Sequence, residues 1–179
     1  MMLAIDPGVA GGFAFIDARD NTLRMSPFFN TFHSLGNLGL GAVPNTAYAV
    51  MEQVASSPAM GARRAFTFGR NVGQWEAVIE ALGIAPDKNI RVLPQVWQQN
   101  LNLTGIKGHD RKKTLLNVGE RVLKSIIDNP AKRPVIFSIP KPYPELNLET
   151  VDAFLMLMWG LKNAGNSLDK YSIASKAKK

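Results

Sequence analysis

Four carboxylates lie at the borders of apolar segments, where an ionised side chain needs a cation. Asp6 follows the apolar run Met-Leu-Ala-Ile, and Glu52 follows a second run, Ala-Tyr-Ala-Val-Met. Glu149 and Asp152 lie at the start of a third apolar segment. Burial of a carboxylate is costly unless the group is paired, hydrogen-bonded or bound to a metal. Together the four acids could supply a bridging aspartate and further ligands for two metal ions about 3.5–4 Å apart.

Each acid also has a purely structural interpretation. Asp6 opens an Asp-Pro-Gly turn, which is ordinary turn chemistry. Glu149 and Asp152 near the start of a helix are common solvated caps, and the helix dipole favours their charged forms. For any single acid both interpretations stay open, but four such acids are a less common set.

The remaining residues narrow the kind of metal site. The chain has no cysteine, and its two histidines, His33 and His109, are isolated. These facts exclude thiolate sites and argue against a histidine-rich zinc site. Ligation by oxygen alone suits Mg²⁺, with Mn²⁺ as its substitute.

The segments that must position these acids alternate between strand and helix patterns, without internal repeats. Alternating or continuous apolar runs predict strands over 2–5, 13–16, 22–31, 46–54 and 90–93. A further run over 135–139 could pair as a strand. Helical spacing predicts helices over 62–82, 94–101 and 112–127, and glycine and proline predict a loop or broken helix over 34–44. These patterns predict an α/β fold.

The last helix is expected to carry two of the four acids. Asn147 is a favourable N-cap for a helix that runs from Leu148 onward. Residues three apart lie on one face of a helix, so Glu149 and Asp152 would share a face in its first turns.

Length and charge restrict the class of protein. The 179 residues, 46% of them hydrophobic, suffice for one buried core. The strands over 2–5 and 13–16 would form a hairpin with Asp6 at its mouth, as in an RNase H-like nuclease or an actin-like ATPase. The length favours the nuclease, because an actin-like ATPase needs two lobes of this fold to close over its nucleotide. The formal net charge of +7 points to an anionic polymer as partner. Neither a signal peptide nor a membrane span is recognisable, so we expect an intracellular protein.

The order and intervals of these segments resemble the RuvC-type Holliday junction resolvases of the RNase H-like family, particularly their phage and poxvirus-like branch. The resemblance covers most of the chain. It rests on Ile5-Asp6-Pro7-Gly8 with Gly12, Glu52-Gln53-Val54, Phe68-Gly69-Arg70 with Gly73, Pro94 with Trp97-Gln98, and Glu149-Thr150-Val151-Asp152-Ala153.

The resemblance implies an RNase H-like fold, in which a central mixed five-stranded sheet is flanked by helices. Residues 168–179, which end in Lys176, Lys178 and Lys179, are expected to form a basic, flexible tail, and the resemblance implies a nuclease domain over 1–167. It also assigns the metal to Asp6, Glu52, Glu149 and Asp152, with Mg²⁺ as the expected ion.

By the same resemblance the chain is a homodimeric endonuclease that resolves four-way DNA junctions by paired symmetric nicks. The stretch Thr104-Gly105-Ile106-Lys107-Gly108 and a following lysine would contact DNA near the scissile phosphate. That catalytic lysine is either Lys112 or Lys113. The expected DNA-binding residues are Lys107, Arg111, Lys112, Lys113 and Arg70.

Two departures from the family pattern broaden the expected specificity. Bacterial relatives usually have aspartate where Glu149 stands, and they have an aromatic residue where this chain has Ala55. The aromatic residue is implicated in unstacking the junction centre. Two alternatives therefore stay open, a less selective endonuclease for flaps and forks, and a DNA-binding module without catalysis.

Overall fold

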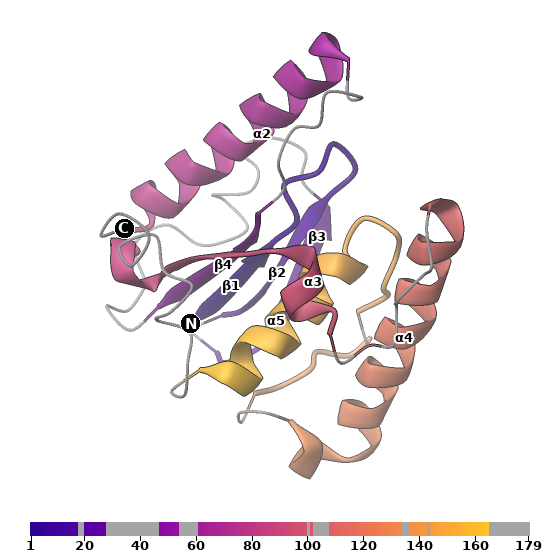
Figure 1. Cartoon of the computed structure of the whole chain (residues 1–179). Coiled ribbons are helices and arrows are strands. Elements are labelled where there is room, and N and C mark those ends of the chain that lie inside the picture. The colour runs from indigo at the N-terminus through magenta and orange to yellow at the C-terminus, as the bar shows by residue number, and fades with distance from the viewer. Residues whose placement is uncertain are drawn as a thin grey trace.

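One mixed sheet organises the protein (Figure 1). The computed structural model describes residues 1–17, 20–27, 47–53, 61–99, 101, 108–133, 137–142 and 144–164. Its strands are β1 (Met2–Ile5), β2 (Gly12–Ile16), β3 (Leu23–Pro27), β4 (Tyr48–Glu52) and β5 (Asn89–Val92). They form a five-stranded sheet in the order β3-β2-β1-β4-β5.

Strand direction brings the first two acids to the same edge of the sheet. β2 is antiparallel to β1 and β3, whereas β1, β4 and β5 are mutually parallel along the sheet. Ile5 of β1 pairs with Met51 of β4. Asp6 and Glu52, each one residue further along, therefore lie beside each other at the carboxyl ends of neighbouring strands.

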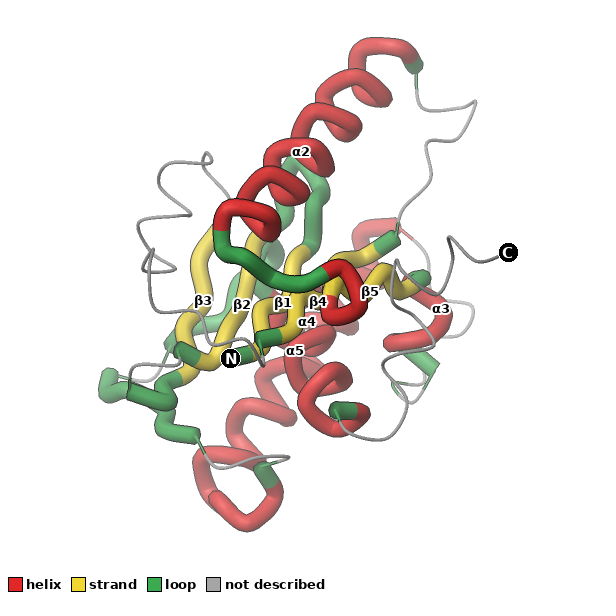
Figure 2. Tube along the Cα trace, turned by 90° about the vertical axis from the view of Figure 1, so that its left-hand side faces the viewer, coloured by secondary structure: helices red, strands yellow, loops and turns green. Residues whose placement is uncertain are grey.

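Helices cover both faces of the sheet, as Figure 2 shows. α2 (Ala62–Ala81) lies on one face, and α5 (Val151–Asn163) lies on the other with α4 (Gly108–Asp128) beyond it. The short helix α3 (Pro94–Trp97) follows β5, and single 3-10 turns occur at Pro86–Lys88 and Pro130–Lys132. No helix in these described ranges is long and apolar enough to cross a membrane.

The alternation of side chains along the strands builds two cores. Leu3, Ile5, Phe13 and Phe15 pack with Trp75 of α2 in one cluster of buried residues. The intervening side chains point to the opposite face and pack with α4 and α5; among them are Met2, Ala4, Ala14 and Ile16. Ten of the 13 residues of α5 are buried, because the sheet and α4 enclose it.

The structure moves several predicted boundaries. α4 begins at Gly108 rather than Lys112, because its polar first turn lacks the apolar spacing that starts at Leu115. α3 ends at Trp97 rather than Leu101. Of the run over 135–139, Ser138 forms an isolated bridge with Thr22, and residues 135 and 136 lie outside the described residues. The predicted segments over 34–44 and 168–179 and the residues Ala55 and Lys107 also lie outside them.

The last helix begins later than predicted, although its predicted cap forms. α5 begins at Val151, and Thr150 is its N-cap residue. The Asn147 side chain accepts hydrogen bonds from the backbone N–H groups of Glu149 (2.9 Å) and Thr150 (3.0 Å), and its carbonyl accepts from the N–H of Val151 (3.0 Å). These are the hydrogen bonds of a helix cap, so Asn147 caps the turn over 148–150 that leads into α5, as predicted. Glu149 lies in this turn.

Gly12 fixes the distance between the sheet and the turn that precedes α5. A Cβ atom at Gly12 would lie 2.7 Å from the carbonyl oxygen of Ser26 and 2.8 Å from that of Glu149. Both obstacles are backbone atoms, which cannot move aside as a flexible side chain can. The absence of a side chain at Gly12 therefore sets how closely Asp152 approaches β1.

We predict that Gly12→Ala lowers the free energy of unfolding by about 1–3 kcal/mol, the usual cost of forcing an atom into a packed site. Gly73→Ala is the matched control, because a Cβ there meets nothing within 4 Å on a helix. That change should raise stability by about 0.5–1 kcal/mol. Urea unfolding of both variants measures the difference, and equal stability of Gly12→Ala and wild type would contradict the close approach.

Candidate active site

Asp6 is held at the mouth of the first hairpin. Its backbone N–H donates to the carbonyl of Gly12 (2.9 Å), and its Oδ1 accepts from the N–H of Gly8 (2.9 Å). Burial raises the pKa of Asp6, and the negative charge of Asp152 raises it further. The charge of Lys112 and the Gly8 hydrogen bond act in the opposite direction. The hairpin thus presents a buried carboxylate whose charge needs stabilisation.

Asp152 reaches the same place from the first turn of α5. Its residue is only 4% exposed, and it is the one charged residue among the buried positions of that helix. Oδ2 accepts a hydrogen bond from Lys112 Nζ at 2.7 Å. Oδ1 is buried and has no hydrogen-bond partner in the described part of the chain. This oxygen is available to a further ligand.

Glu52 completes a group of three acids. The Trp97 indole N–H donates to Glu52 Oε1 at 3.1 Å. Burial and the negative charges of Asp6 and Asp152 raise the pKa of Glu52 to about 7, against the Trp97 hydrogen bond and the charge of Arg111. The sequence pattern included Trp97 but gave it no role. Trp97 is the last residue of α3, the short helix directly after β5, and this position brings its indole to Glu52.

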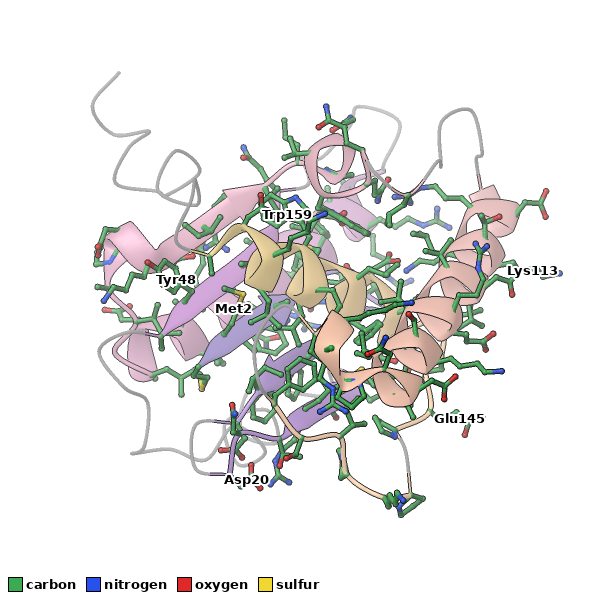
Figure 3. The ribbon with its side chains drawn as sticks, turned by 90° about the horizontal axis from the view of Figure 1, so that it is seen from below. Met2, Asp20, Tyr48, Lys113, Glu145 and Trp159 are labelled. Atoms are coloured by element: carbon green, nitrogen blue, oxygen red, sulfur yellow. The ribbon has the colours of Figure 1, made fainter. Side chains whose placement is uncertain are left out.

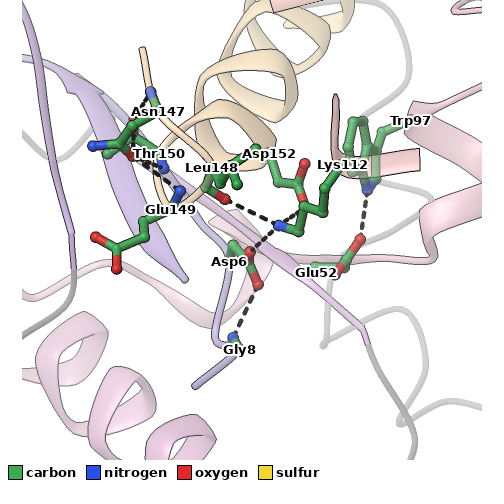
Figure 4. Close-up of polar contacts among 10 residues, drawn as sticks. All are labelled: Asp6, Gly8, Glu52, Trp97, Lys112, Asn147, Leu148, Glu149, Thr150 and Asp152. Carbon is green, nitrogen blue, oxygen red and sulfur yellow. Dashed lines mark hydrogen bonds and ion pairs between the residues drawn. The ribbon is translucent and has the colours of Figure 1, made fainter. Parts of the chain in front are cut away.

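Lys112 extends from α4 into this acidic group (Figure 4). Nζ lies 2.7 Å from Asp152 Oδ2 and 3.6 Å from Asp6 Oδ2, and it donates to the Leu148 carbonyl at 3.3 Å. Burial alone would lower the pKa of Lys112, but the carboxylates of Asp152 and Asp6 outweigh it and raise that pKa. Lys112 therefore stays positively charged.

The structure brings Lys112, and not its neighbour, to the acids. Lys113 is exposed, and its side chain points outward from α4 in Figure 3. Consecutive helical residues diverge by about 100° around the axis, so only one of the two lysines can face the site. Arg111 is partly buried and acts electrostatically on Glu52. Arg70 is exposed on α2, a different helix from the one that carries Lys112.

Glu149 does not share a face with Asp152, so that prediction was wrong. Its residue is exposed in the turn before α5, and its carboxylate points away from Asp6 and Lys112 in Figure 4. A shift of the 147–150 turn would be needed to bring it to the other acids. Its part as a metal ligand stays a prediction.

The chemistry of the three gathered acids suits a divalent cation. Asp6, Glu52 and Asp152 offer only oxygen, and the charge of Lys112 balances one of them. The buried Asp152 Oδ1 has no hydrogen-bond partner in the described part of the chain, and the pKa values of Asp6 and Glu52 are raised. Both observations indicate that the negative charge of the three acids is only partly balanced by positive groups. Within the described ranges, however, no three acidic or histidine side chains are arranged closely enough to hold a metal ion. The Lys112 ammonium lies between the two aspartates instead.

Comparison with known proteins identifies the fold. No protein-family model and no curated protein matches the sequence. The structure resembles that of T. thermophilus RuvC in complex with Holliday junction substrate, with a TM-score of 0.50 and 13% identity over 91% of this chain and 93% of that chain. A second Thermus thermophilus RuvC structure aligns with a TM-score of 0.48 and 14% identity over 91% and 94% of the two chains. The first similarity confirms the predicted RNase H-like fold.

Stability should fall with rising pH because of Glu52. Its folded-state pKa of about 7 exceeds the ordinary value of 4.5, so the folded protein holds the Glu52 proton more tightly. The stabilisation by Glu52 is therefore complete when the pH lies below 4.5, and it is lost as the pH rises through about 7. Asp6 acts in the same direction. We predict that Glu52→Gln loses less stability than wild type between about pH 5 and pH 8, measured by urea unfolding.

Glu145→Gln is the control for this measurement, because Glu145 is exposed at the surface (Figure 3). Its pH profile should follow that of wild type. Parallel profiles for Glu52→Gln and wild type would show that Glu52 titrates as a solvated acid.

Proposed function

We propose that this protein is a divalent-metal-dependent endonuclease of the RuvC type, which cleaves branched DNA and resolves four-way junctions. One observation carries the proposal: the ends of β1 and α5 bring Asp6 and Asp152 onto one lysine, with Glu52 adjacent. Buried acids of this kind are expected where a site needs negative charge for function, since they cost folding stability.

Phosphodiester hydrolysis needs the functions that these residues would supply. Asp6, Asp152 and Glu52 would hold Mg²⁺, or Mn²⁺ in its place, and Glu149 is the proposed fourth ligand. When bound, such ions activate water and neutralise charge on the reacting phosphate and leaving oxygen. Lys112 would pair with a phosphate oxygen, and Arg111, whose charge acts on Glu52, would contact the same strand.

The choice of DNA follows from the shared fold and from symmetry. The T. thermophilus protein of the same fold is in complex with a Holliday junction substrate. A four-way junction has near two-fold symmetry, so its resolution by paired nicks requires two such sites, as in a homodimer. Phosphate contacts give affinity for any DNA, whereas discrimination rests on branch shape and deformability.

A less selective endonuclease for flaps and forks is the second candidate. By the resemblance, Ala55 stands where bacterial relatives carry the aromatic residue implicated in unstacking the junction centre. We therefore propose junction preference together with measurable cutting of other branched DNA.

We predict that Asp152→Asn abolishes cleavage while the protein still folds and binds DNA. Asparagine keeps the shape of the side chain but removes its charge. Loss of a direct metal ligand should exceed the 10–100-fold effect that is typical of residues behind the ligands, so we expect a fall of more than about 100-fold. Cleavage of a labelled four-way junction in Mg²⁺ measures it, with circular dichroism as a check on folding.

Glu145→Gln serves as the control here as well, because it also neutralises one acid but on the exposed surface. It should cleave as wild type does. Near-normal cleavage by Asp152→Asn, or activity of wild type after thorough chelation, would contradict the metal-dependent mechanism.

Substrate preference is a separate prediction. The protein should cut a four-way junction faster than a flap or fork, and a linear duplex of equal length most slowly. Parallel reactions with the four labelled substrates, with both product ends mapped, measure this order. Equal cutting of duplex and junction would leave a general nuclease, and binding without cutting in any metal would leave a DNA-binding module.

A further inference from the structure

The ammonium group of Lys112 lies against one carboxylate oxygen of each of the two aspartates that would bind a metal ion. Nζ is 2.7 Å from Asp152 Oδ2 and 3.6 Å from Asp6 Oδ2. Both carboxylates are buried, so water screens these charges poorly. Lys112 thus holds the two aspartates together as an internal cation.

A divalent ion on the same oxygens would compete with this lysine. Mg²⁺ binds carboxylate oxygen at about 2.0–2.1 Å, so an ion on Asp152 Oδ2 would lie within about 5 Å of Nζ. Two cations at that separation in a buried site repel each other strongly. Full occupancy by the divalent ion therefore favours withdrawal of the ammonium group from the carboxylates.

Lys112 has a route away from the aspartates that does not require refolding. Its side chain is 33% exposed, and its third contact is the neutral carbonyl of Leu148. Leu148 itself is 40% exposed, so this side of the ammonium group faces the surface. Lysine carries its charge on a flexible four-carbon stem, which can turn towards an anion while α4 stays in place.

A DNA phosphate is the anion that would draw the lysine outward. We propose that Lys112 is a positioning residue that couples metal binding to DNA binding: it keeps Asp6 and Asp152 together until a phosphate accepts its ammonium group, which frees both carboxylates for the metal. This inference rests on the proposed function. Because coupling between two ligands is reciprocal, the metal must tighten DNA binding by the same factor.

The test compares Lys112→Met with Lys113→Met, which removes the adjacent, exposed lysine. Ca²⁺ is the probe, because its looser coordination should permit binding without cleavage. Isothermal titration measures Ca²⁺ affinity without DNA, and fluorescence anisotropy measures affinity for a labelled four-way junction with and without saturating Ca²⁺. Lys112→Arg keeps the charge and serves as the conservative variant.

For Lys112→Met we expect Ca²⁺ affinity without DNA to rise about tenfold, equivalent to about 1.4 kcal/mol, while Lys113→Met and Lys112→Arg stay near wild type. Ca²⁺ should tighten junction binding by wild type and Lys113→Met, and much less so for Lys112→Met. Equal Ca²⁺ affinity and equal tightening in Lys112→Met and wild type would overturn the coupling but leave the metal site intact. Absence of Ca²⁺ binding in every variant, with and without junction, would overturn the proposed metal site itself.

Discussion

The burial of the Asp152 charge is the constraint on which the rest of the site depends. α5 is enclosed by the sheet and α4, so the carboxylate in its first turn is cut off from bulk water. Removing the partner of a buried charge typically costs about 3–5 kcal/mol. Lys112 supplies that partner from α4, so two helices and the end of β1 are joined through one ammonium group. Such an arrangement stabilises less than an apolar core would, which favours a functional reason for it.

The backbone around Asp152 also helps to bring the acids together. Parallel pairing of β1 and β4 places Asp6 beside Glu52, and Gly12 lets the carbonyl of Glu149 approach the sheet. The three acids therefore come from two strands and one helix that are far apart in sequence. Burial raises the pKa values of Asp6 and Glu52, and the negative charges of the neighbouring acids raise them further.

Much of this arrangement could be predicted from the sequence because it follows strong periodic patterns. The apolar runs before Asp6 and Glu52 predicted β1 and β4, and the helical spacing over 62–82 predicted α2. The fold class followed from the order of these elements. The position of Asp6 and Glu52 at the ends of buried strands could therefore be predicted from the sequence alone.

Other features depend on contacts that no periodic pattern reveals. Asn147 makes the predicted capping hydrogen bonds, but the regular helix begins only at Val151, and Glu149 lies exposed in the turn between them. The choice between Lys112 and Lys113 depends on the rotation of α4, which is fixed by packing against α5 rather than by its polar first turn. The contact of Trp97 with Glu52 likewise requires the tertiary fold.

The most direct measurement is a crystal structure of the protein with a four-way junction and Ca²⁺, which should bind without supporting cleavage. We expect Ca²⁺ at about 2.3–2.6 Å from oxygens of Asp6 and Asp152, beside a phosphate that Lys112 contacts. Ca²⁺ bound elsewhere on the protein, with the Lys112 ammonium still on Asp152 and no phosphate at the three acids, would contradict this expectation.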